Sequence, residues 1–167
     1  IPGRAKLLER IKEFDAGKPY SISDITLVPS SGGLFYFKQL ASENVAKLYA
    51  RSDLQGEEKL LIDPEKFPKP DGGGHHSLGF YRVSPNGKQV LYGFAASGSE
   101  QTTLKIFDRT SGRDLPESID RIEAEYALPY WLPDGQRFVY SRRRELPADA
   151  PATEGYKFTQ AFLHEVG

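Results

Sequence analysis

Short apolar runs alternate with turn residues along most of this chain. The run Val90-Leu91-Tyr92 follows the turn sequence Ser84-Pro85-Asn86-Gly87, and Phe138-Val139-Tyr140 closely follows Leu132-Pro133-Asp134-Gly135. Asn-Gly and Asp-Gly dipeptides fit tight turns because both residue types tolerate positive φ angles, and the apolar run after such a turn is typical of a strand. The pattern predicts consecutive antiparallel strands over residues 20–167.

The turn-and-strand pattern repeats at a nearly constant interval. Ser84 and Leu132 are 48 residues apart (132 − 84), and a degenerate earlier copy at Pro29 lies 56 residues before Pro85 (85 − 29). A strand-rich unit repeated every 40 to 50 residues or so is typical of a β-propeller blade. Several runs are apolar on both faces, which favours blades sandwiched between neighbours.

We therefore expect an all-β fold, a partial β-propeller of about three four-stranded antiparallel blades, preceded by a short N-terminal α-helix. Blade one is expected over residues 20–66, blade two over 76–122, and an incomplete blade three over 126–167. A closed propeller needs at least about four blades, and 167 residues are too few for that. The chain also begins with Ile and has no Met, so we expect it to be part of a longer protein.

The N-terminal segment, residues 1–18, has the pattern of an amphipathic helix over residues 3–16. Charged residues cover one side, and apolar residues at helical spacing form the other: Leu7, Leu8, Ile11 and Phe14. Pro2 suits the helix start and Gly17 its end. We expect the apolar side to pack against a larger body. The mixed charges of the polar side do not favour binding to anionic lipid.

Composition excludes several classes of function. The chain is 27% charged with a net charge of −1, which argues against disorder and against a dedicated nucleic-acid surface. No apolar run reaches the roughly 18 residues of a membrane span, so we expect neither nucleic acid nor membrane as a partner. With no Cys, disulfides and thiolate chemistry are ruled out, but a cytoplasmic and a periplasmic location both stay open.

No catalytic or cofactor motif is found in the sequence. Gly-x-Ser-x-Gly, the nucleophile elbow of α/β-hydrolases, is missing, as are the Walker loop, His-Glu-x-x-His and the calcium loop. His75 and His76 are adjacent, so in an extended chain their side chains point opposite ways, and the third histidine is the distant His164. We therefore expect no catalytic residue, no metal and no cofactor within this chain.

Three polar segments have less specific interpretations. The Gly- and Ser-rich stretch 93–100 lies between two predicted strands, so a hairpin connection is favoured over a phosphate-binding loop. Residues 145–151 are a polar insertion in the last hairpin. The basic cluster 142–144 is either a solvated strand end or an electropositive patch that faces a substrate or another domain.

Several segments resemble one family in order and spacing. Residues 91–100, with 103–105 and 112–116, resemble the second blade of the prolyl oligopeptidase family of serine peptidases. Trp131-Leu132-Pro133-Asp134-Gly135 is similar to the next blade, and residues 44–49 with 61–65 are similar to the first. The N-terminal helix also has a counterpart just before that propeller.

The resemblance implies a propeller that restricts access to a serine endopeptidase acting on short peptides. Its partner would be a C-terminal α/β-hydrolase peptidase domain of the same parent chain, which carries the Ser-Asp-His triad; this chain alone would be inactive. In the family an aromatic residue near the substrate lies in the strip that corresponds to residues 120–130, which makes Tyr126 the candidate substrate-facing residue here. Tyr130 fits packing between blades at least as well. The alternative is a non-enzymatic β-propeller that serves as a binding or scaffold module.

Overall fold

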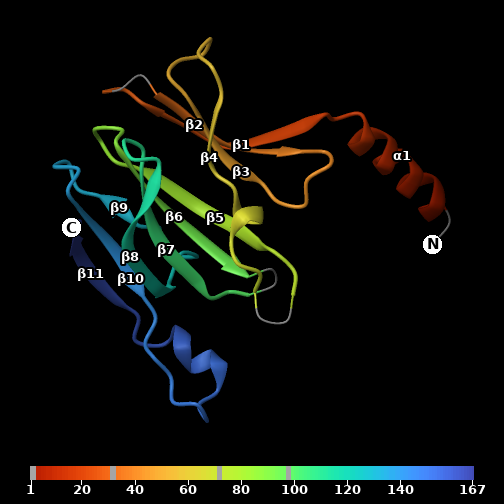
Figure 1. Cartoon of the computed structure of the whole chain (residues 1–167). Coiled ribbons are helices and arrows are strands. Elements are labelled where there is room, and N and C mark those ends of the chain that lie inside the picture. Colours follow the sequence, from red (N-terminus) through yellow and green to blue (C-terminus); the bar gives the residue numbers. More distant parts are fainter. Residues whose placement is uncertain (1–2, 31–32, 71–72, 97–98) are drawn as a thin grey trace.

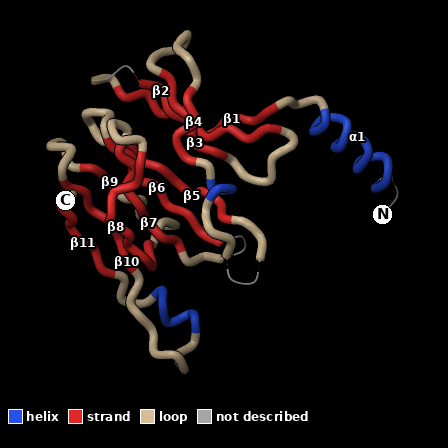
Figure 2. Tube along the Cα trace, viewed as in Figure 1, coloured by secondary structure: helices blue, strands red, loops and turns tan. Residues whose placement is uncertain are grey.

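The computed structural model describes residues 3–30, 33–70, 73–96 and 99–167, and these are mostly β-structure with one N-terminal helix (Figures 1 and 2). The helix α1 spans Arg4–Ala16. The strands are β1 (Tyr20–Val28), β2 (Gly33–Leu40), β3 (Lys47–Arg51), β4 (Lys59–Ile62), β5 (His76–Val83), β6 (Gln89–Ala96), β7 (Thr102–Asp108), β8 (Arg113–Ile122), β9 (Tyr130–Trp131), β10 (Arg137–Arg142) and β11 (Gln160–Glu165). Two 3₁₀ turns, η1 (Pro64–Lys66) and η2 (Ala152–Tyr156), lie in the connections.

The strands pair antiparallel in two sheets. The first sheet has four strands in the order β1-β2-β3-β4. The second has seven strands in the order β11-β10-β8-β7-β6-β5, with β9 paired to β10. The expectation of three four-stranded sheets is therefore met only by the first sheet, because β5–β8 and β9–β11 are joined in one seven-stranded sheet. They join where Arg142 pairs with Ile122, next to backbone hydrogen bonds of 2.9 Å from Glu123 N to Ser141 O and from Arg143 N to Arg121 O.

The two predicted Asx-Gly turns lie at corresponding places. Gly87 and Gly135 have φ angles of +71° and +65°, which L-residues with a side chain rarely adopt. The side-chain oxygens of Asn86 and Asp134 accept hydrogen bonds from the backbone two residues on, at 2.9 Å in each turn. The turn residues predicted from the sequence thus lie directly before β6 and β10.

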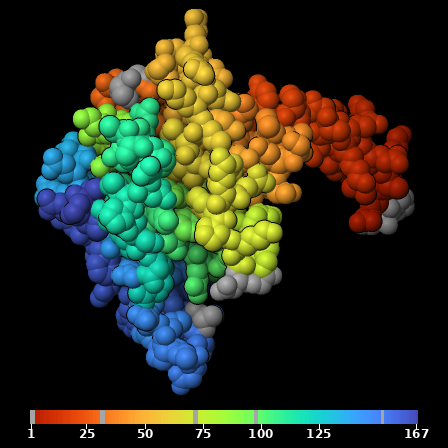
Figure 3. All heavy atoms as spheres, viewed as in Figure 1, coloured from red at the N-terminus to blue at the C-terminus, as the bar shows by residue number. Residues whose placement is uncertain are grey.

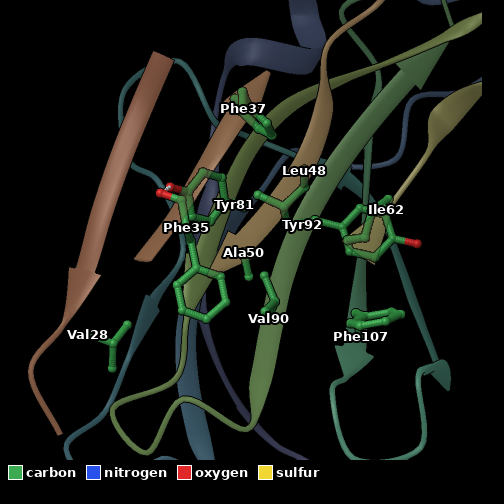
Figure 4. Close-up of a cluster of buried hydrophobic side chains, with 10 residues drawn as sticks. All are labelled: Val28, Phe35, Phe37, Leu48, Ala50, Ile62, Tyr81, Val90, Tyr92 and Phe107. Carbon is green, nitrogen blue, oxygen red and sulfur yellow. Dashed lines mark hydrogen bonds between the residues drawn. The ribbon is translucent and has the colours of Figure 1, made fainter. Parts of the chain in front are cut away.

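Two hydrophobic clusters separate three layers of strands. The first cluster packs the inner face of the β1–β4 sheet against one face of β5–β8, and includes Phe35, Leu48, Tyr81 and Tyr92 (Figure 4). The second packs the other face of β5–β8 against β9 and β10, and includes Leu91, Leu104, Trp131 and Phe138. Because side chains alternate along a strand, neighbouring residues such as Leu91 and Tyr92 enter opposite clusters. The central strand β6 is thus buried on both faces, as its apolar run predicted.

The helix α1 projects from the side of the sheets (Figures 1 and 3). None of its residues is buried, and its apolar side chains stay open to solvent: Leu7 is 62% exposed, Leu8 45%, Ile11 55% and Phe14 62%. The expected packing of this side against a larger body is not found among the described residues. Within the same residues, no helix has the length and apolar character needed to cross a membrane.

The connections gather at two ends of the sheets. At one end, here called the turn end, the tight turns meet: Ser30 Oγ donates to Pro85 O, and Asn86 lies beside Gly135. The opposite end, here called the α1 end, is where α1 joins β1. Since the strands run antiparallel, the described residues that follow β2, β4, β6, β8 and β10 belong to the α1 end: 41–46, 63–70, 73–75, 99–101, 123–129 and 143–159.

Candidate functional site

The first strands of the three layers, β1, β5 and β9, lie next to one another and form what we call the inner edge. Tyr81 Oη on β5 donates to Phe35 O at 2.9 Å and also to Asp24 O on β1. Trp131 Nε1 on β9 donates to Arg82 O at 2.9 Å. Both aromatic rings are almost fully buried, at 2% and 5% exposed. Each therefore satisfies its polar atom on a neighbouring strand and fixes the spacing of the inner edge.

Asp24 makes the connection to Tyr81 possible through its backbone. Its φ angle is +52°, and the pairing of β1 with β2 shifts register between Ser23 and Thr26. Such a bulge leaves an extra residue outside the ladder and bends the strand. The Asp24 carbonyl therefore points out of the sheet and accepts the hydrogen bond from β5.

Two depressions run along the inner edge. One, of about 230 Å³, lies between β1 and β5 and is also lined by Leu128. The other, of about 400 Å³, lies nearer the turn end and is lined on one side by Leu27 and on the other by Tyr130. Arg82 lines both, and among the described residues it forms no ion pair. The wall is otherwise rich in exposed apolar side chains, with Ile25 65%, Leu27 62% and Tyr130 65% exposed.

Tyr126 lies in the 123–129 connection, at the α1 end of this edge. Its side chain is 85% exposed, so it packs against neither cluster. The connection begins only at residue 123, because residues 120–122 belong to β8; the strip named from the sequence is therefore partly strand. Tyr130 begins β9 and points away from the cluster that holds Trp131. The exposure of Tyr126 is compatible with the predicted contact to a peptide, which stays a prediction.

The connection that carries Tyr126 is anchored by a buried ion pair. Glu123, 4% exposed, accepts from Arg143 Nε at 2.5 Å and from the backbone N of Glu125 at 3.0 Å. Burial lowers the pKa of Arg143, but the Glu123 carboxylate outweighs this effect and raises it above its usual value. Arg143 also lies 4.0 Å from the centre of the Tyr156 ring, and Tyr156 Oη donates to Glu100. Three connections at the α1 end are thus linked.

These contacts decide what the basic cluster 142–144 is. Arg142 pairs with Asp120 and Arg143 with Glu123, while Arg144 lies 6.0 Å from the Phe158 ring centre. Two of the three charges are therefore neutralised within the fold, and the cluster is not an open electropositive patch. The polar insertion 145–151 follows the cluster and leads into η2.

The histidines do not form a metal centre in the described part of the chain. No group of three or more His, Cys, Asp or Glu side chains there is placed to hold a metal ion. His76 begins β5 and packs edge-on against Phe94, with ring centres 5.3 Å apart. His164 lies on β11, 5.0 Å from the centre of the Phe138 ring. Both rings are thus engaged in packing.

Comparison with known proteins gives one consistent result. Residues 3–167 match the family described as prolyl oligopeptidase, N-terminal β-propeller domain. Among curated proteins, the chain is 22% identical to the prolyl endopeptidase of Elizabethkingia meningoseptica over 169 aligned positions, which cover all of this chain and 22% of that protein. It is 26% identical to an uncharacterised peptidase, y4sO, of Sinorhizobium fredii over 117 positions, covering 68% of this chain and 15% of that protein.

Solved structures agree. A structure from a study of two prolyl endopeptidases and the role of inter-domain dynamics is 30% identical, with a TM-score of 0.78 over 99% of this chain and 23% of its own. Prolyl oligopeptidase B of Galerina marginata, bound to a 35mer hydrolysis and macrocyclisation substrate, is 18% identical with a TM-score of 0.72 over 98% of this chain and 25% of its own. The chain thus spans about a quarter or less of each of these proteins.

Proposed function

Because this chain belongs to the prolyl oligopeptidase family, as part of its N-terminal β-propeller domain, we propose that it forms the gating, substrate-access portion of a serine endopeptidase that acts on short peptides. The peptidase domain would be supplied elsewhere in the same parent chain. The observation that carries the proposal is the inner edge: three first strands locked side by side, with an exposed apolar wall and an exposed Tyr126 at one end.

A gate of this kind works by size. A flexible peptide passes or bends along a narrow wall, whereas a folded chain does not fit. Rigid positioning of the wall matters more than any single contact, and the two buried hydrogen bonds from Tyr81 and Trp131 provide it. Exposed apolar side chains such as Ile25 and Leu27 offer contacts that do not depend on the peptide's sequence.

Uncovered apolar surfaces support a longer parent. The outer face of β9–β11 exposes Tyr130, Val139 and Leu163, which the strand pairing places on one side of the sheet. A further blade over this face would bury it. The apolar side of α1 would pack on the peptidase domain. Within the parent, the blades would span residues 20–66, 76–122 and 126–167, after the helical segment 1–18.

The proposal is tested in the full-length protein that carries this segment. We expect one serine outside residues 1–167 to react with a fluorophosphonate, and short proline-containing peptides to be cleaved. Tyr126→Ala should raise KM for such peptides severalfold, since apolar contact worth roughly 1 kcal/mol is lost, with kcat and the melting temperature nearly unchanged.

A matched control is Leu54→Ala. Leu54 is 81% exposed but lies in the connection between β3 and β4, at the turn end. Leu54→Ala should leave KM, kcat and the melting temperature unchanged. A large drop in melting temperature with a normal KM in Tyr126→Ala would refute the substrate-facing role of Tyr126. Labelling of a serine within residues 1–167 would refute the proposal that the peptidase domain lies elsewhere in the parent chain.

A further inference from the structure

A larger cavity lies away from the inner edge, where the connection between β4 and β5 crosses the end of β6. Its volume is about 580 Å³, within the usual range for a small-ligand site. The cavity belongs to the α1 end, because Phe67, Pro68 and Pro70 come from the connection, His76 from the start of β5, and Phe94 from near the end of β6. In Figure 3 the yellow connection lies beside the green strands. We call this cavity the Phe67 pocket.

Three rings form the apolar wall of the Phe67 pocket. The centre of the Phe67 ring lies 5.1 Å from that of Phe94 and 5.9 Å from that of His76, and His76 lies 5.3 Å from Phe94. Two of these contacts are edge-to-face, a geometry that aromatic rings favour. The wall is therefore held in place by its own packing and is present without a ligand.

The charged side chains that line the Phe67 pocket are both cationic. They are Lys69 and Lys105, and no Asp or Glu is among the described lining residues. Lys105 Nζ lies 3.5 Å from Asp114 Oδ2, which also accepts from Tyr92 Oη at 2.8 Å, so its charge is partly compensated. Lys69 is exposed and forms no ion pair among the described residues. The pocket thus combines an aromatic wall with a net positive rim.

We propose that the Phe67 pocket binds the C-terminal residue of a peptide. An apolar or aromatic side chain would contact Phe67 and Phe94, and the terminal carboxylate would face Lys69 and Lys105. A C-terminal apolar residue carries both features on one residue, whereas Asp and Glu carry a carboxylate without the apolar group. This inference rests on the proposed function, because a peptidase creates a new C-terminal carboxylate at each cleavage.

The experiment uses the full-length protein after its reactive serine has been blocked with a fluorophosphonate. Binding of acetyl-Gly-Leu-Phe, with a free carboxylate, is measured by calorimetry beside the same peptide with a C-terminal amide. We expect the acid to bind about tenfold more tightly than the amide, and Lys69→Glu to raise its Kd by about tenfold. Added salt should weaken binding of the acid peptide more than binding of the amide peptide.

The matched control is Lys66→Glu. Lys66 is exposed in η1, three residues before Lys69, and does not line the pocket. It changes the net charge equally and should alter the Kd less than twofold, a bound set by long-range screening. Equal binding of acid and amide, equal effects of the two lysine variants, or no binding of either peptide would overturn the inference.

Failure of this inference is distinguishable from failure of the proposed function. The unblocked protein is assayed on a short, N- and C-terminally blocked proline peptide, which has no carboxylate to place in the pocket. If that peptide is cleaved but the acid does not bind, the Phe67 pocket has another role and the gate proposal stands. If the acid binds but no proline peptide is cleaved, the proposed peptidase function is wrong.

Discussion

Replacing Gly93 by Ala should destabilise the molecule, although alanine is ordinarily the better residue in a strand. Gly93 on β6 is paired directly with Phe80 on β5. A Cβ atom added at Gly93 would lie 2.5 Å from Phe80 Cζ and 2.7 Å from Cδ1, and closer still to Cε1. Real Cβ atoms do not approach ring carbons so closely. The Phe80 ring therefore occupies the space of the missing side chain.

The magnitude follows from how little the ring can move. Phe80 is 5% exposed and is packed in the cluster that joins β5–β8 to β9 and β10. Forcing it out of place costs about 1 to 3 kcal/mol, as overpacking of a filled core generally does. Glycine's own conformational entropy would favour the alanine by roughly 0.5 to 1 kcal/mol. We expect the clash to win, with a net loss of about 1 to 2 kcal/mol.

The assay is hydrogen exchange of the full-length protein, followed by mass spectrometry on peptides that cover β5 and β6. It reports local stability without requiring two-state unfolding of a large protein. Gly79→Ala is the control, because a Cβ at Gly79 meets no atom within 4 Å and its φ angle is not in the left-handed region. Gly79→Ala should leave protection unchanged or raise it slightly.

Two outcomes would refute this reasoning. One is Gly93→Ala with protection equal to or above that of the unmodified protein. The other is a double variant, Gly93→Ala with Phe80→Leu, whose loss of hydrogen-exchange protection equals the sum of the losses in the two single variants. A smaller ring-free side chain relieves the clash, so the two changes should be strongly coupled.

The remaining predictions concern contacts between strands and one carboxylate. Trp131→Phe leaves Arg82 O without its donor and should lower stability by about 1 kcal/mol, seen as a reduced denaturant midpoint; an unchanged midpoint contradicts the role of this hydrogen bond in the inner edge. Glu123→Ala leaves the buried Arg143 charge without its partner and should lower the free energy of unfolding by about 3 kcal/mol or more. Replacing both residues by leucine should lower it much less, and equal losses in the two variants would argue against an unpaired buried charge. Burial raises the pKa of Glu58, but three hydrogen-bond donors outweigh it and hold this pKa below its usual 4.5. The folded state therefore binds fewer protons at Glu58, so the stability that this carboxylate contributes is complete above about pH 4.5 and falls as the pH is lowered further. Glu58→Gln should flatten the dependence of the melting temperature on pH over that range. An unaltered slope would show that Glu58 is not responsible.

The strands in the middle of the sheets were the predictable part of this fold. The runs after Asn86-Gly87 and Asp134-Gly135 become β6 and β10, because the turn residues and the apolar pattern indicate the same structure. The local pattern suffices where turn residues and an apolar run both indicate the same strand.

The sequence pattern of β1 and of β8 predicts a strand less clearly. β8 is rich in charged residues and contains Pro116, which is tolerated where one side of a strand lacks a ladder partner. β1 loses its alternation at the Asp24 bulge. In both, the partner strand determines the structure, and the residues do so only weakly by themselves.

The candidate site was predictable only in part for a related reason. Tyr126 was proposed from its place between two motifs, and its role stays a prediction. The inner edge depends on hydrogen bonds between residues far apart in sequence, such as Tyr81 to Phe35. The Phe67 pocket brings together Phe67, Phe94 and Lys105 from three segments whose spacing has no motif. Such sites require the fold before they can be recognised.

The central claim, that this propeller segment gates a peptidase by size, is tested most directly by one comparison of rates. The full-length protein is given a proline-containing decapeptide, either free or placed in a surface loop of a stable folded carrier, and kcat/KM is measured for each. We expect the free peptide to be cleaved and the same sequence in the carrier to be cleaved at least about a hundredfold more slowly, a loss equivalent to about 2.7 kcal/mol in transition-state stabilisation. Equal kcat/KM values for the two substrates would contradict the account.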